Sequence, residues 1–199
     1  MVSRADHRRS MLLRLGDAAV ELMERHGSGV TIDAIAAAAG VSRRTVIRYV
    51  DLKEELVYVH PILWLDVFDQ AIAEFADRPV PERLRIGSAA LGRHIDADPE
   101  PVRRAFMVAV MNPDLAKGFT AVFQRWVERV AAEVLVGVDE PVAADRFRSR
   151  VVGASVMGTI DAVTREWLIA GGASTYSQLL ADAHHILDPL LDRLDALDD

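Results

Sequence analysis

Residues 31–56, TIDAIAAAAGVSRRTVIRYVDLKEEL, contain two short helical patterns separated by a glycine. Thr31 is a good N-cap, and the apolar residues within 32–39 recur at helical spacing. Gly40 can end the first helix in a left-handed conformation, and Ser42 can cap the second. This order predicts a helix-turn-helix, a motif that places its second helix in the major groove of DNA.

The second helix of this motif is rich in arginine. An arginine near the start of a helix in the major groove can donate two hydrogen bonds to guanine O6 and N7, worth about 1–3 kcal/mol of base discrimination. Arg43, Arg44 and Arg48 are the candidates for such a contact, with Arg44 the first choice. A phosphate contact or a solvated surface position is the alternative for each of them.

A third helix is expected to begin directly after the motif. Asp51 and Glu54 predict a capping box at its N-terminus. Lys53 lies in the same first turn, where the helix dipole disfavours a cation unless a negative group such as a DNA phosphate lies nearby. The alternative is a solvated lysine on an exposed turn.

Charge is distributed unevenly along the chain. The net charge is −7, yet residues 1–50 contain eight Arg, no Lys and five acidic residues, which gives them a charge of +3. The remaining 149 residues carry −10. A basic end on an acidic body draws the phosphates of DNA to that end only. The acidic total is therefore compatible with DNA binding.

Composition sets the broad class of protein. The 199 residues are 51% hydrophobic, which is ample for a core, and none is a cysteine. Disulfide bonds, cysteine-ligated metal sites and thiol catalysis are therefore excluded. The apolar run 11–15 is too short and too charged for a secretion signal, and no apolar run is expected to reach membrane-spanning length. We expect a cytoplasmic protein with no membrane partner.

Helical patterns fill the rest of the chain, and no segment alternates like a strand. We predict an all-α fold, with an N-terminal three-helix helix-turn-helix DNA-binding domain over 1–51 and a C-terminal helical effector-binding and dimerisation domain over 52–199. Pro61 should kink or split the first helix of the second domain. The expected helices are 6–25 before the motif and, after it, 52–76, 82–97, 100–111, 113–136, 141–170 and 175–196.

The last two helices are apolar over more of their surface than one buried face requires. Such width is typical of helices that pack inward on their own domain and outward on a second copy, forming a four-helix interface. A fully buried helix pair in a monomer is the alternative. The candidate dimer residues are Val156, Ile160, Val163, Trp167, Leu179, Ile186, Leu190 and Leu194.

These motifs resemble the TetR family of one-component bacterial transcriptional regulators. The strings DAAVELMERHG (17–27), TIDAIAAAAGVSRRTVIRYV (31–50) and DLKEEL (51–56) match its DNA-binding signature in order and spacing, and GASVMGTIDAVTREWLIAGG (153–172) looks like its dimerisation region. The resemblance implies a homodimer that binds an operator in double-stranded DNA, most often a repressor released by a small-molecule effector. The positions that match the family's DNA contacts are Thr31, Arg43, Arg44, Thr45, Arg48, Tyr49 and Lys53.

Two residues depart from the family's pattern. The family commonly has a tyrosine where this chain has Ile47, and a phenylalanine where it has Val50. The first change removes a hydroxyl that often helps to position the recognition helix. Arg48 and Tyr49 are therefore expected to do more of that positioning.

The C-terminal part offers apolar side chains that suit a hydrophobic effector. Simple core packing is the alternative for each of them. Asp161 lies among apolar residues and can meet a polar group of the effector, although an ion pair with Arg165 one turn on is the favoured alternative. The candidate effector-binding residues are Trp64, Phe68, Met107, Met111, Phe123, Trp126, Met157 and Asp161.

Other classes of function have weaker support. No histidine pair has the spacing of a zinc site with a third ligand, and the sequence has neither a glycine-rich phosphate loop nor a serine elbow. We expect no enzyme activity, no metal and no cofactor. A regulator whose body senses a partner protein, or has no ligand, is the remaining alternative.

Overall fold

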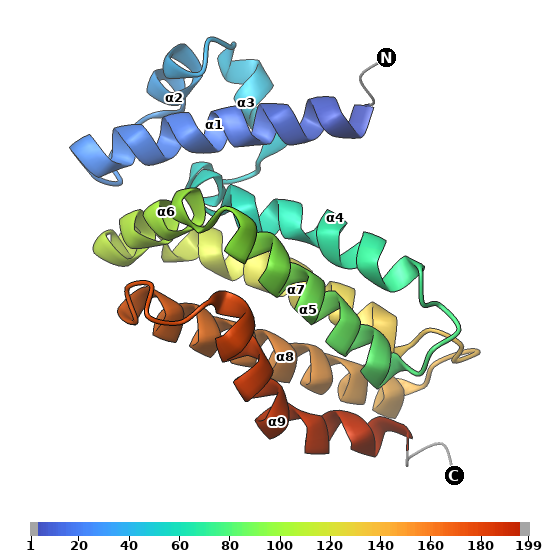
Figure 1. Cartoon of the computed structure of the whole chain (residues 1–199). Coiled ribbons are helices and arrows are strands. Elements are labelled where there is room, and N and C mark those ends of the chain that lie inside the picture. Colours follow the sequence, from blue (N-terminus) through green and yellow to red (C-terminus); the bar gives the residue numbers. More distant parts are fainter. Residues whose placement is uncertain (1–3, 196–199) are drawn as a thin grey trace. The chain divides into compact units, whose positions relative to one another are not determined.

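The computed structural model describes residues 4–195, and side chains as far as residue 189. Figure 1 shows these residues as helices joined by loops, and no strand occurs in this part of the chain. The predicted all-α fold is therefore confirmed. The elements are α1 (Arg4–His26), α2 (Ile32–Ala38), α3 (Arg43–Tyr49), the 3-10 helix η1 (Lys53–Tyr58), α4 (Val59–Ala73), α5 (Val80–Ala97), α6 (Pro99–Met111), the 3-10 helix η2 (Pro113–Leu115), α7 (Ala116–Val134), α8 (Ala143–Ile169) and α9 (Tyr176–Asp195).

The chain forms two compact units. Unit 1 comprises Met1–Leu63 and Glu100–Val122, and unit 2 comprises Trp64–Pro99 and Phe123–Asp199. The predicted boundary between residues 51 and 52 divides functions, and it stays a prediction. The packing units differ from it because η1 and η2 pack with each other and η1 packs on α1.

The core of unit 1 forms where its short helices meet α1, and Figure 1 shows α2 and α3 on the same side of α1. Burying each of these aliphatic side chains contributes roughly 1.5–3 kcal/mol, which fixes helices too short to be stable alone. Among the completely buried aliphatic residues are Leu12 and Leu15 of α1, Ile35 of α2, Val46 of α3, Leu56 of η1 and Leu115 of η2.

The segment after α3 begins differently from the expected helix. The predicted capping box of Asp51 and Glu54 is wrong, because the capping carboxylate belongs to Glu55, whose Oε1 accepts the Leu52 N–H at 3.2 Å. The first turns are the 3-10 helix η1, and the α-helix starts only at Val59. Pro61 is therefore the third residue of α4, where a backbone N–H has no partner within the helix.

One stretch reaches membrane-spanning length, contrary to the prediction from the sequence. Lys53–Ala73 has 21 residues and a mean hydropathy of 1.2, and 56% of its apolar window is buried inside the fold. A buried core helix meets the same criteria of length and composition.

In unit 2, one carboxylate holds the start of α9. Asp96 at the end of α5 accepts the backbone N–H of Tyr176 at 2.7 Å and that of Ser177 at 3.0 Å. The Tyr176 hydroxyl lies 2.9 Å from Thr164 Oγ1 of α8, and its ring packs edge-on against Trp167. Burial raises the pKa of Tyr176, so this hydroxyl stays protonated and available as a donor. These contacts join α5, α8 and α9 at one place.

Candidate DNA-binding surface

Two short capped helices and a tight turn form the predicted helix-turn-helix. Thr31 Oγ1 accepts the Ala34 N–H at 3.2 Å, and Ser42 Oγ accepts the Thr45 N–H at 3.2 Å. Gly40 between the helices has a φ of +64°, which glycine adopts without steric cost. The predicted motif, its caps and its turn residue are confirmed.

The hydroxyls at the starts of α2 and α3 are committed as acceptors but can still donate. Thr45 Oγ1 lies 2.9 Å from Ser42 Oγ, so one of these hydroxyls donates to the other. Thr31 is exposed and uses its oxygen as an acceptor only in the cap, which leaves its O–H proton for a phosphate oxygen. Its predicted phosphate contact is compatible with this geometry and stays a prediction.

The exposed side of α3 is mostly cationic. Arg43 Nη1 donates to Asp33 Oδ2 at 2.8 Å, an ion pair exposed to solvent that joins α3 to α2. The Arg48 guanidinium lies 5.3 Å from the centroid of the Tyr49 ring. Within residues 4–195, Arg44 makes no hydrogen bond or ion pair, so its five donors remain for DNA. The exposed residues of α3 are Arg43, Arg44, Ile47 and Arg48.

Lys53 lies against the loop that precedes α2. Its Nζ donates to the carbonyl oxygens of Ser28 and Val30, both at 2.8 Å. These two acceptors explain a cation in the first turn of η1 without a phosphate. The ammonium has a third donor, so the predicted DNA backbone contact is still possible chemically and stays a prediction.

The same loop is also held from α6 and η2. Ser28 Oγ donates to Asp114 Oδ2 at 3.1 Å. Arg104 of α6 donates from its Nε and Nη2 to the carboxylate of Glu24 near the end of α1, and this contact lowers the pKa of Glu24 below its usual value. The entrance to the helix-turn-helix is thus bonded on one side to η1 and on the other to the α6–η2 segment.

At Gly118 the first turns of α7 touch the backbone of η1. A Cβ atom at Gly118 would lie 2.4 Å from the carbonyl carbon and oxygen of Glu54, which no packed atom can tolerate. Only glycine therefore allows this approach. The contact fixes where η1, and with it Lys53, lies in unit 1.

Known proteins share the part of the chain that carries this geometry. Residues 15–58, from α1 to the end of η1, match the family model of bacterial regulatory proteins, tetR family. This segment is similar to the DNA-binding domain of TetR-family regulators, and the chain is a DNA-binding transcriptional regulator.

Relatives extend the similarity beyond the TetR DNA-binding segment. A candidate mycofactocin biosynthesis transcriptional regulator of Mycobacterium tuberculosis (strain ATCC 25618 / H37Rv), MftR, is 26% identical over 201 residues, covering 96% of this chain and 97% of that protein. FadR of Bacillus subtilis in complex with stearoyl-CoA has a TM-score of 0.56 at 16% identity, covering 87% of this chain and 96% of that one. FadR of Thermus thermophilus, a TetR-family repressor in complex with lauroyl-CoA, has a TM-score of 0.54 at 21% identity, covering 87% and 91%. The two solved structures support the TetR fold for most of the chain.

The aromatic candidates for the effector site are packed in unit 2. The rings of Phe68 and Trp126 meet edge-on with centroids 5.5 Å apart, and the Arg129 guanidinium lies 5.6 Å from the Phe68 centroid. A Cβ atom at Gly87 would lie 2.4 Å from the Phe68 ring. This part of unit 2 is tightly filled, so a ligand contacting Phe68 would have to displace its ring. Trp64, Phe68, Trp126 and Met157 are buried, and Phe123 is partly buried.

The other predicted effector residues lie in different environments. Asp161 accepts a hydrogen bond from Arg165 Nε at 2.8 Å, which confirms the ion pair favoured in the sequence. Met107 and Met111 of α6 belong to unit 1 and are 44% and 73% exposed. The effector contacts predicted for these three residues stay predictions.

The predicted dimer residues divide into core and surface. Val156, Val163 and Trp167 are buried within the chain itself, whereas Ile186 of α9 is 83% exposed. Ile160 and Leu179 are partly buried. The side chains of Leu190 and Leu194 lie outside the described residues. Ile186 is thus the candidate that a second copy can contact directly.

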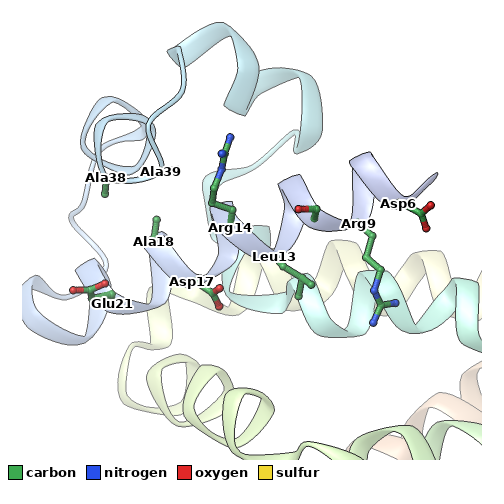
Figure 2. Close-up of a pocket in the computed structure, with 10 residues that line it drawn as sticks. Asp6, Arg9, Leu13, Arg14, Asp17, Ala18, Glu21, Ala38 and Ala39 are labelled. Carbon is green, nitrogen blue, oxygen red and sulfur yellow. The ribbon is translucent and has the colours of Figure 1, made fainter. Parts of the chain in front are cut away.

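An open groove of about 600 Å³ follows α1 in unit 1. Figure 2 shows Arg9 and Arg14 pointing to opposite sides of α1, with Ala38 of α2 facing Ala18 across the groove. The two cations do not converge on one point, and carboxylates share the lining. None of the predicted DNA-binding or effector residues lines this groove, which is lined by Asp6, Arg9, Ser10, Leu13, Arg14, Asp17, Ala18, Glu21, Ala38 and Ala39.

Several residues that position the site were missed in the sequence. Asp33 of α2 was not among the predicted site residues, although it pairs with Arg43. Ser28 and Asp114 meet across 86 positions of sequence, and no local pattern relates them. A glycine near the start of α7 was the one available signal of close backbone contact.

Proposed function

We propose that the protein is a homodimeric repressor that leaves its operator when an amphiphilic effector with a long apolar chain binds the body of each subunit. The exposed cationic side of α3, which includes Arg44, supports operator binding through the major groove. A dimer would match two half-sites about one helical turn of DNA apart.

Relatives support the class of effector. The FadR proteins of B. subtilis and T. thermophilus were solved with stearoyl-CoA and lauroyl-CoA, which combine an apolar chain with an anionic head. In this chain the buried aromatic residues of unit 2 provide apolar surface for such a chain. Acyl-CoA thioesters are therefore the first effectors to test.

Chain continuity provides a route from effector to DNA. Helix α4 begins in unit 1 at Val59 and ends in unit 2 at Ala73. Displacement of Phe68 by a ligand would shift α4, and η1 directly precedes α4. Because Lys53 of η1 holds the loop before α2, this shift would alter the position of the helix-turn-helix. The ligand must bind the released state more tightly than the DNA-bound state for this to occur.

The decisive experiment begins with selection of an operator from a random DNA library by the full-length protein. Gel-shift titrations on that operator at fixed salt then compare stearoyl-CoA, lauroyl-CoA and coenzyme A without an acyl chain. We expect the acyl compounds to weaken operator binding by about 5- to 150-fold and coenzyme A alone to have little effect. Calorimetry measures binding to the protein itself.

Each outcome decides one part of the proposal. Failure to select any preferred sequence would refute operator binding. Acyl-CoA that binds without changing operator affinity would refute the coupling, and acyl-CoA that does not bind would refute this effector class. Phe68→Leu should reduce the effector response while retaining operator binding, and Phe75→Leu, at a more exposed phenylalanine of unit 2, is the matched control.

A further inference from the structure

An isoleucine occupies the middle of the cationic side of α3. At 3.6 residues per turn, positions 43, 44, 47 and 48 share one side of the helix, and position 47 falls between the arginines in angle. Val46 lies outside this range of angles and is buried, as is Val50, the extended C-cap residue that follows the helix. Ile47 is 52% exposed. A large aliphatic side chain thus stands in water, flanked by Arg43, Arg44 and Arg48.

Single exposed apolar residues are ordinary on protein surfaces, so exposure alone decides nothing. The neighbours of Ile47 decide what can cover it. Three exposed guanidinium groups repel a cationic partner and attract the phosphates that border a DNA groove. The surface that covers Ile47 is therefore the floor of the major groove.

The major groove has one apolar group to offer, the 5-methyl group of thymine. An isoleucine has no hydrogen-bonding atom, so it cannot distinguish bases by their donors and acceptors. It is also branched at Cβ, which in a helix leaves essentially one χ1 rotamer and holds its methyl groups in place before binding. Contact with a methyl group is the recognition that this side chain can perform.

We propose that Ile47 reads a thymine in each operator half-site by packing against its 5-methyl group. This inference rests on the proposed function, since it requires that α3 enters the major groove. Where a hydrogen-bonding side chain would contact a base edge or a phosphate, Ile47 makes the recognition depend on one methyl group of the DNA.

The experiment uses the operator selected above and replaces its thymines one at a time with deoxyuridine, which differs only in lacking the 5-methyl group. We expect one position per half-site at which this change weakens binding of the full-length protein by roughly fourfold, the value of burying about one methyl group. At that position Ile47→Ala should bind thymine and deoxyuridine equally, and Ile47→Val should keep part of the difference. Val136→Ala, at an exposed valine outside α3, should keep all of it.

Binding is measured for the unchanged protein and for Ile47→Ala, each on the thymine and the deoxyuridine operator. The difference between the two deoxyuridine effects isolates the contact between the methyl group and Ile47. The same deoxyuridine effect in Ile47→Ala as in the unchanged protein would overturn the proposal, as would the absence of any sensitive thymine. Circular dichroism and thermal unfolding confirm that the exposed substitution leaves the fold intact. If no operator can be selected, operator binding and this inference both fail, whereas a selected operator without a thymine effect refutes the inference alone.

Discussion

The ammonium group of Lys53 lies at an unfavourable position for a cation and is stabilised there by two backbone carbonyl groups. The sequence places a cation where a helix dipole disfavours it, and the structure places two backbone carbonyl oxygens within 2.8 Å of its Nζ. A phosphate was the expected partner. Tertiary contact with Ser28 and Val30, which local reasoning could not predict, provides negative partial charge instead.

Replacing Lys53 therefore tests stability as well as DNA binding. Lys53→Met removes two hydrogen bonds from a charged donor, so we expect the free energy of unfolding to fall by about 1.5–3 kcal/mol. Urea denaturation measures this loss. If Lys53 also contacts phosphate, operator and random DNA should lose affinity equally, and the salt dependence should decrease by about one unit of slope. Unchanged stability would contradict the hydrogen bonds to the loop.

Arg44 should act on sequence specificity rather than on stability. It is exposed and has no partner among residues 4–195, so Arg44→Ala removes no described interaction. We expect a loss of about 1–3 kcal/mol of discrimination at one base position per half-site. Binding to operators with single base changes measures it. Arg93→Ala, at an exposed arginine of α5, controls for the loss of one charge; equal losses on operator and random DNA would rule out base reading by Arg44.

Among the elements, η1 depends on one glycine of α7. Gly118→Ala would bring a Cβ atom to 2.4 Å from the Glu54 backbone, so η1 or α7 must move. We expect destabilisation of about 1–3 kcal/mol or more. Thermal unfolding measures it.

Gly158 provides the matched control for Gly118. It is also a helical glycine, but a Cβ atom there would meet no atom within 4 Å. Gly158→Ala should be neutral or stabilise the protein by up to about 1 kcal/mol. Equal effects of the two substitutions would show that contact with η1 is not what requires glycine at position 118.

Helix α9 should weaken at acid pH through His184. Burial lowers the pKa of His184 below 6.5, so the unfolded chain binds a proton more readily than the folded protein. The stabilising effect of a neutral His184 is complete above the unfolded pKa and is lost as pH falls through the lower folded pKa. Nearby Asp188 opposes the shift, whereas Arg85, which pairs with Asp188, and to the smallest extent the adjacent His185 support it.

Urea midpoints from about pH 7.5 to about pH 5.5 measure this dependence. His184→Gln should make stability less sensitive to pH in that range. His185→Gln changes an exposed neighbour on the same helix and should leave the dependence largely as it was. A pH profile unaltered in His184→Gln would exclude this histidine as a source of acid sensitivity.

Local patterns predicted the helices well and the junctions poorly. Thr31, Gly40 and Ser42 act within a few residues of themselves, so their roles followed from the sequence. The start of η1 did not, because Asp51 and Glu54 fitted a capping pattern, whereas the carboxylate that caps η1 is that of Glu55, which accepts the Leu52 N–H. At the site, the exposed arginines of α3 were predictable, whereas the bonds from Lys53 required knowledge of the loop before α2.

For the whole molecule, dimerisation is the central prediction. Ile186 is 83% exposed on α9, while Trp167 lies inside the chain, so only the first can be changed without disturbing the core. We expect Ile186→Glu to shift the protein from dimer to monomer in light scattering and to weaken operator binding strongly. Val110→Glu, at an exposed valine of α6, should do neither. A dimer that persists in Ile186→Glu would place the interface elsewhere.

At the scale of the whole molecule, charge differs between the N-terminal part of the chain and the rest. The first 50 residues are basic and the remainder is acidic, so we expect the phosphates of DNA to be drawn to the N-terminal part of a protein whose net charge is −7. The sequence predicted this completely, because charge can be counted without a fold. The partners of individual charges, such as Arg104 with Glu24, required the structure.

The three tryptophans of the chain, Trp64, Trp126 and Trp167, are all buried and all belong to unit 2. Fluorescence excited selectively at tryptophan therefore comes from unit 2 and not from the helix-turn-helix. Tryptophan emission from the unmodified protein reports the state of unit 2, while a dye attached to the operator reports DNA binding. Time courses of the two signals, recorded together after effector is added, reveal whether unit 2 changes before or after the operator is released.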